Sequence, residues 1–117
     1  MATSGRNFSI EGAVAGADLT GHQYRWVKLD SADSSKISVI PAAAVGEGIG
    51  ILQNAPREGE AANVAYLGVS KLVASGAIGV GAAVQSAADG KGVSGGSMAT
   101  ALTEATAADQ ILTVVVK

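Results

Sequence analysis

Apolar and polar side chains alternate along residues 24–30, which is the pattern of a β-strand with one face turned toward a core. Val27 and Leu29 share one side of this segment, whereas Tyr24 and Trp26 share the other. Further apolar runs bounded by polar segments predict more short strands. These runs cover residues 37–40, 48–54, 63–73, 80–85, 93, 98–102 and 111–116.

Polar segments with turn-forming residues separate these runs. The clearest are SADSSK at residues 31–36, PREGE at residues 56–60 and ADGKG at residues 88–92. The Asp-Gly pair of the last segment supplies the positive φ angles that hairpin turns need. Six to eight short strands joined by such turns predict an all-β fold, either a small β-barrel or a sandwich.

The segment GGSMATALTEATAA, at residues 95–108, allows a second interpretation. Its middle is rich in alanine, and Met98 and Leu102 stand at helical spacing. A short helix over about residues 97–107 is therefore the alternative to a strand here.

The stretch Asn63–Val84 is apolar, nearly uncharged and interrupted by four glycines. Its first half, residues 63–73, carries apolar side chains on both faces of the predicted strand, so both faces are expected to be covered. The glycines are expected to let neighbouring backbones approach closely. Ser75 and Gly76 are expected to begin a corner in the chain.

Residues 1–20 are rich in Gly, Ala and Ser and carry few larger apolar side chains. Two interpretations stay open: a loose terminus, or an extended N-terminal arm that orders against another chain through Phe8 and Ile10. With the arm, the predicted organisation is an extended segment at residues 1–20 and a single β-rich domain at residues 21–117.

Composition narrows the possible roles. The hydrophobic fraction is 48% but the aromatic fraction is only 3%, so the core must be built mainly from small side chains. The 16 glycines raise the entropic cost of folding, which favours stabilisation by association with copies or a partner. The net charge of −2 without a basic stripe argues against nucleic acid as a partner. No apolar run suits a secretion signal or a membrane span.

Residues with catalytic potential do not form a recognised set. Neither Gly46–Gly50 nor Gly76–Gly81 completes a dinucleotide or phosphate-binding motif. His22 is the only histidine, there is no cysteine, and Glu58 and Glu60 lie in one solvated turn. The expectation is a protein that is not an enzyme and has no cofactor, metal or small-molecule substrate.

Large side chains at the predicted surface indicate a contact role instead. Trp and Tyr are favoured at interfaces because they bury much area and keep a polar group. The candidate contacts with a partner or with another copy are Phe8, Ile10, Tyr24, Trp26 and Tyr66. The alternative for Trp26 is a place in the core.

Four runs carry a resemblance to a known family. They are YRWVKLDSADSSKISVI, VGEGIGILQNAPREGE, YLGVSKLVASGAIGVGAAVQSAADGKGV and QILTVVVK. In order and pattern they resemble the DUF2190-type capsid cement or decoration proteins of tailed bacteriophages, over about residues 24–117. The resemblance implies a β-rich structural protein made in the host cytoplasm and located on the exterior of the virion capsid. Its implied partners are the major capsid protein and further copies, as a homotrimer or homodimer.

A second class of function stays open beside this one. The glycine-rich corner at residues 75–84 also suits a small β-barrel carrier module of the lipoyl or biotinyl type. Such modules present an exposed lysine at a hairpin tip. Lys91 stands in Asp-Gly-Lys-Gly, which departs from the usual setting of that lysine.

Overall fold

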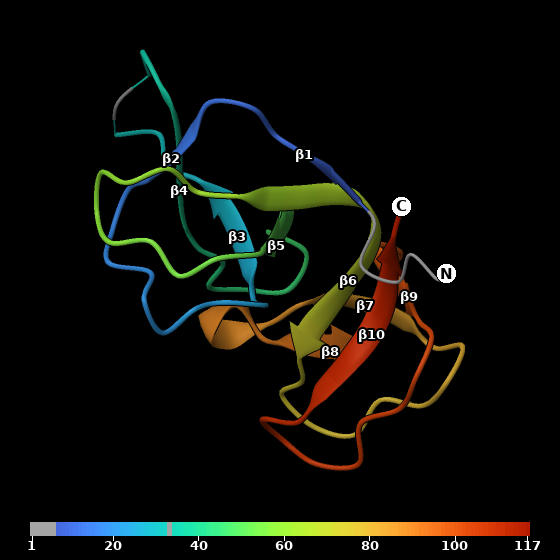
Figure 1. Cartoon of the computed structure of the whole chain (residues 1–117). Coiled ribbons are helices and arrows are strands. Elements are labelled where there is room, and N and C mark those ends of the chain that lie inside the picture. The colour runs from blue at the N-terminus through green and yellow to red at the C-terminus, as the bar shows by residue number, and fades with distance from the viewer. Residues whose placement is uncertain (1–6, 33) are drawn as a thin grey trace.

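The computed structural model describes residues 7–32 and 34–117 and confirms the predicted all-β class (Figure 1). The described residues form ten strands, and their only helical element is the 3₁₀ turn η1 (Ala88–Gly90). The strands are β1 (Asn7–Ser9), β2 (Ala13–Ala15), β3 (Trp26–Leu29), β4 (Ile37–Pro41), β5 (Gly50–Leu52), β6 (Val64–Val73), β7 (Ala83–Ser86), β8 (Gly92–Ser94), β9 (Ala99–Ala101) and β10 (Ile111–Val116).

One long strand, β6, organises the sheet. The strand order is β2-β4-β3-β5-β6-β10-β9-β7-β8, and β1 pairs with β6 outside this path. The first residues of β6 pair with β5, and its second half pairs with β10. Since Ala65 and Gly68 each have partners on both sides, β1 lies on the opposite edge of β6 from β5 and β10. The sheet is rolled but not closed into a barrel.

A bend in β6 lets this strand serve both halves of the sheet, as Figure 1 shows. The register with β1 slips by one residue, because Phe8 lies opposite Leu67 whereas Ser9 lies opposite Ala65. Tyr66 is therefore the extra residue of a β-bulge. Gly68 follows with a φ of 103°, which a residue with a side chain rarely adopts. The bulge and this glycine together bend the strand.

Two hydrophobic cores lie on the two sides of the central strands. Neighbouring residues of β3 face opposite ways: Val27 packs in the N-terminal core and Trp26 in the C-terminal core. The N-terminal core consists of Ala13, Ala15, Leu19, Val27, Val39, Leu52, Ala62 and Val64. The C-terminal core consists of Trp26, Ala42, Ile51, Leu72, Ala74, Ile78, Val84, Ala99, Ala101, Ala105, Leu112, Val114 and Val116. Most members of both cores are Ala, Val and Leu, as the composition predicted.

The helix expected as an alternative over residues 97–107 is wrong. Ala99 and Ala101 are both buried, and they flank Thr100 in β9, which pairs with β7 and β10. The alternation of this short run with period two, together with two neighbouring strands, outweighs the helical propensity of its alanines.

The predicted strand count of six to eight is too low because the first twenty residues contribute β1 and β2. β2 pairs in parallel with β4, and Leu19 is fully buried in the N-terminal core. Residues 7–19 thus pack on the sheet of their own chain. Residues 1–6 of the segment predicted as an arm lie outside the described residues, and the division of the chain at residue 20 stays a prediction.

The loop between β4 and β5 is held to β7 by a buried hydroxyl. Ser86 is fully buried, and its Oγ donates a hydrogen bond to the Ala44 carbonyl at 3.0 Å. The same Oγ accepts a hydrogen bond from the Gly48 N–H at 3.1 Å. Glu47 closes the loop from within, because its carboxylate accepts hydrogen bonds from the N–H groups of Ala43 and Ala44.

We expect Ser86→Ala to lower the free energy of unfolding by about 1–3 kcal/mol, because it removes the two hydrogen bonds that hold the β4–β5 loop to β7, each worth about 0.5–1.5 kcal/mol. Urea denaturation followed by tryptophan fluorescence measures the change. Ser94→Ala, at an exposed strand position, is the matched control and should change stability by less than about 0.5 kcal/mol. Equal effects of both substitutions would contradict the assignment of this role to Ser86.

Candidate interaction surface

Three large side chains that lie together along β1 and β6 remain exposed. Phe8 is 63% exposed and Leu67 is 41% exposed. The two residues lie directly opposite each other in the antiparallel pair, so their side chains share one face. Tyr66, at the bulge, is 45% exposed. We call Phe8, Tyr66 and Leu67 the apolar face.

Beside the apolar face lies a shallow groove. It is lined by Ser9, Ile10, Glu11 and Tyr66 and has a volume of about 570 Å³. Ile10 is partly buried and packs against the N-terminal core, so it forms the floor of the groove while Phe8 stands outside it. The site is therefore open and mainly apolar, without the enclosure that small-molecule pockets have.

Side-chain and backbone hydrogen bonds fix β1 on β6. Asn7 Nδ2 donates to the Val69 carbonyl at 3.0 Å, and the Ile10 N–H donates to the Val64 carbonyl at 2.9 Å. The Ser9 hydroxyl is 2.6 Å from Asn63 Oδ1. No strand of the described residues pairs with the outer edge of β1. Phe8 thus lies exposed on a short edge strand whose position is fixed by these hydrogen bonds to β6 and Asn63.

Tyr24 and Trp26 do not join the apolar face. Trp26 is 1% exposed and packs in the C-terminal core, which is the alternative that the sequence left open. Both faces of β3 are covered here, so the indole cannot reach a partner on the surface. Tyr24 precedes β3 with a φ of 65°, and Lys71 Nζ lies 5.7 Å from the centroid of its ring. Of the predicted contacts, the structure gathers Phe8, Ile10 and Tyr66.

Leu67 belongs to the apolar face but was not among the predicted contacts. The apolar pattern of residues 63–73 predicted that both faces of this strand would be covered, and at Leu67 this is wrong. Leu67 pairs with Phe8 of β1, and no other part of the described residues packs over this face of the pair closely enough to bury either side chain. Only knowledge of the long-range pairing between Phe8 and Leu67 singles this leucine out.

A charged cluster joins the β7–β8 turn to the start of β3. Asp89 Oδ2 is 2.8 Å from Arg25 Nη1, and Asp89 Oδ1 is 3.2 Å from His22 Nε2. The hydrogen bond with His22, and next the positive charge of Arg25, lower the pKa of the Asp89 carboxyl, while partial desolvation opposes them. The hairpin turn predicted at residues 88–92 is confirmed. Through Asp89 it is bound to His22 and Arg25, which lie just before β3.

We expect Asp89→Asn to remove a small part of the stability in a pH-dependent way. A carboxyl with a lowered pKa in the folded state stabilises the fold above its unfolded value near 4, and this contribution is lost as the pH falls through the lowered value. Because Asp89 is 58% exposed, the loss at pH 7 should stay below about 1 kcal/mol. Asparagine tolerates the φ of 62° at this position.

Thermal unfolding of the wild type and of Asp89→Asn between about pH 2 and pH 7 measures this effect. The gap between the two melting temperatures should close below about pH 4. Glu104→Gln, at an exposed loop position, is the control for a lost negative charge. A gap that stays constant down to the lowest pH would show that the charge of Asp89 is not responsible.

Lys91 does not have the setting of a carrier lysine. Its Nζ forms an ion pair with Asp109 Oδ1 at 2.7 Å, and only 24% of its side chain is exposed. A lysine that carries a swinging prosthetic group needs a free, extended side chain. The geometry of the described residues therefore does not favour the carrier interpretation.

Residues 7–32 and 34–117 contain no group of three or more His, Cys, Asp or Glu that could hold a metal ion. In the same ranges no helix has the length and apolar character needed to cross a bilayer.

The chain is similar in fold to a solved bacteriophage structure. No family model and no curated protein matches its sequence. Among solved structures, it is similar to the head fiber gp8.5 N base in bacteriophage phi29, with a TM-score of 0.69 and 21% sequence identity. The similarity covers 96% of this chain and 93% of that one. At this identity the similarity shows a shared fold, and the resemblance to the cement and decoration family stays a prediction.

Proposed function

We propose that this chain is a structural protein of a bacteriophage virion that binds the outside of the head and stabilises the assembled capsid, as a cement or decoration protein. The observation that carries the proposal is the fold shared, over nearly the whole of both chains, with a phage head fiber base. Fold alone does not specify function, so the surface of this chain must supply the second argument.

The apolar face supplies that argument. Its two aromatic side chains are of the kind that dominates binding energy at protein interfaces, and they are held on paired strands that need little ordering on binding. The major capsid protein is the proposed partner, and a second copy of this chain is the alternative occupant. A protein that binds only the assembled lattice stabilises it by mass action, and many copies on one head add their effects.

A second candidate follows from the description of the neighbouring structure. That protein is the N base of a head fiber, so this chain could serve as the base that fixes a fiber to the head. Both candidates require attachment to the head surface. Electron microscopy of heads saturated with a chain of full natural length separates them, since a fiber base gives a projecting density and a cement protein a low one.

Co-sedimentation with expanded, empty heads of the source phage that lack this protein tests the proposal. Saturable binding at a copy number that matches the icosahedral symmetry of the head is the expected result. Absence of binding, with heads that retain the ability to bind another surface protein as the control, would overturn it. Intact-mass measurement of the protein purified from its natural source tests the carrier alternative, which requires an adduct on Lys91.

A further inference from the structure

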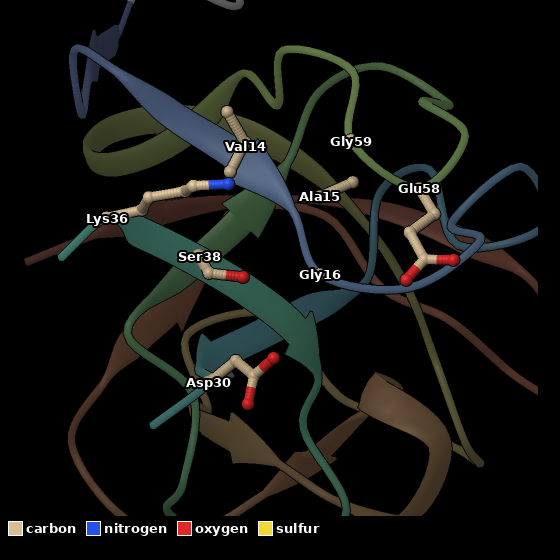
Figure 2. A pocket seen from close by; sticks show the side chains of 8 residues that line it. All are labelled: Val14, Ala15, Gly16, Asp30, Lys36, Ser38, Glu58 and Gly59. Atoms are coloured by element: carbon tan, nitrogen blue, oxygen red, sulfur yellow. The ribbon is translucent and has the colours of Figure 1, made fainter. Parts of the chain in front are cut away.

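A second hollow, separate from the apolar face, lies among β2, the start of β4 and the loop before β6 (Figure 2). Its volume is about 240 Å³. The residues that line it are Val14, Ala15, Gly16, Asp30, Lys36, Ser38, Glu58 and Gly59. The walls therefore combine small apolar groups with two carboxylates, one ammonium group and one hydroxyl.

The Ser38 hydroxyl is the most buried polar group of this pocket. Ser38 is 6% exposed, and within the described part of the chain its side chain has no hydrogen bond. Gly16 lies close against both oxygens, because a Cβ at that position would come within 2.5 Å of Ser38 Oγ and 2.8 Å of Asp30 Oδ2, too close for either contact. A buried hydroxyl and a carboxylate oxygen thus face the same small space, where a ligand with hydrogen-bond donors would satisfy them.

The charges of the pocket favour a cationic ligand. Asp30 Oδ1 accepts the Ala32 N–H at 3.0 Å, which leaves Oδ2 for a ligand. Figure 2 shows Lys36 beside Val14, on the side of the pocket away from Glu58. The ionised Asp30 and Glu58 outweigh the single charge of Lys36, so the pocket has a net charge of −1. With only two carboxylates and a lysine nearby, a divalent metal fits poorly.

We infer that this pocket receives the guanidinium group of an arginine side chain from the protein to which this chain binds. A guanidinium carries five donors in a planar fork, which suits a pocket lined by the oxygen acceptors of Asp30, Ser38 and Glu58. The aliphatic part of the arginine would pack on Val14, which is half-buried at the wall of the pocket. The inference rests on the proposed function for the identity of the partner, the capsid protein, but the chemistry of the pocket stands without it.

Titration of the isotope-labelled full chain with N-acetyl-arginine methylamide tests the inference by NMR. The expected result is saturable shifts of the backbone amides of Gly16 and Ser38, with an affinity in the millimolar range. The citrulline analogue has the same shape without charge and should bind about tenfold more weakly or worse. The lysine analogue should also bind more weakly, because it offers a point charge in place of the fork.

Two variants test separately the negative charge of the pocket and the close packing at Gly16. Asp30→Asn combined with Glu58→Gln should weaken binding of the arginine probe about tenfold or more, whereas the exposed control Glu104→Gln should leave it unchanged. Gly16→Ala keeps both charges but places a methyl group against the Ser38 and Asp30 oxygens, which must move, and it should also abolish the shifts. Absence of shifts in the wild type, or equal shifts with citrulline or lysine, would overturn the inference.

The same variants, used with heads, keep the two proposals distinguishable. If heads bind the wild type but the arginine probe does not, the pocket inference fails while the proposed function stands. If the probe binds specifically but heads do not, the pocket chemistry is supported and the proposed function fails. If both bind, the variant with Asp30→Asn and Glu58→Gln should sediment with heads more weakly than Glu104→Gln.

Discussion

Gly90→Ala should lower the free energy of unfolding by about 2–5 kcal/mol. Gly90 has a φ of 73°, where an alanine side chain costs about 1–2 kcal/mol. Its Cβ would also lie 2.5 Å from the backbone oxygen of Trp26, which cannot rotate away. The turn would have to lift off β3, and this would strain the bonds of Asp89 to Arg25 and His22. The melting temperature should fall by on the order of 10 °C.

Two other glycines separate the two causes of this effect. Gly81 has a φ of 82° but open space around its missing Cβ, so Gly81→Ala should show only the conformational cost of about 1–2 kcal/mol. Gly79 has open space and no positive φ, so Gly79→Ala should be neutral or slightly stabilising. Differential scanning calorimetry of the three variants should give this order. A Gly90→Ala variant as stable as Gly81→Ala would show that the contact with Trp26 is not tight.

The longer strands were predictable because each is a nearly continuous run of apolar side chains that can be recognised without knowing which strands pair with it. β10 has the bounds that its run ILTVVV predicted, and β6 differs from its predicted range by one residue. In both cases the apolar residues are continuous enough for the pattern to fix the element. β1 and β2 are three residues each, and they are ordered by partners in β6 and β4 that lie far along the chain. A local pattern holds no information on such pairing, so the sequence left a loose terminus and an extended arm open and did not predict β1 and β2.

The same limit applies to the glycines. Close backbone packing was expected at Gly76, Gly79 and Gly81, but a Cβ at each of them would meet nothing within 4 Å. Tight contacts lie at other glycines, such as Gly90 and Gly50; a Cβ at Gly50 would come 2.6 Å from the Ala65 carbonyl oxygen across the β5–β6 pair. Glycine content shows that close approaches are allowed. Which glycine is used depends on which strands become neighbours.

The contact residues show why a surface is harder to predict than a strand. Alternation placed Trp26 and Val27 on opposite faces of their strand. The face of Val27 was assigned to the core, and the face of Trp26 was a candidate contact with a partner. The structure has a core on each side of β3, so alternation there separates two interiors. On β6, Leu67 looks equally apolar in sequence but faces solvent beside Phe8. Trp26 and Leu67 differ in exposure because other parts of the chain pack on both faces of β3 but leave one face of β6 open at Leu67.

The double substitution Phe8→Thr and Leu67→Thr should weaken binding to empty heads by at least about tenfold. Both side chains lie on one exposed face, and their loss removes much of the apolar area that the proposed interface would bury. Threonine retains a β-branched side chain suited to a strand, so the free energy of unfolding should change by less than about 1 kcal/mol. Co-sedimentation at increasing protein concentration gives the affinity, and thermal unfolding gives the stability of the same samples.

Val80→Thr is the matched control for this prediction, because Val80 is at least as exposed but lies in the turn between β6 and β7. It removes an exposed apolar side chain without touching the apolar face, and it should leave head binding unchanged. If the double variant and the control bind equally well, the apolar face is not the contact with the head. If the double variant instead loses binding together with its cooperative unfolding transition, Phe8 and Leu67 support the fold, and the contact must be sought elsewhere, first at the pocket around Ser38.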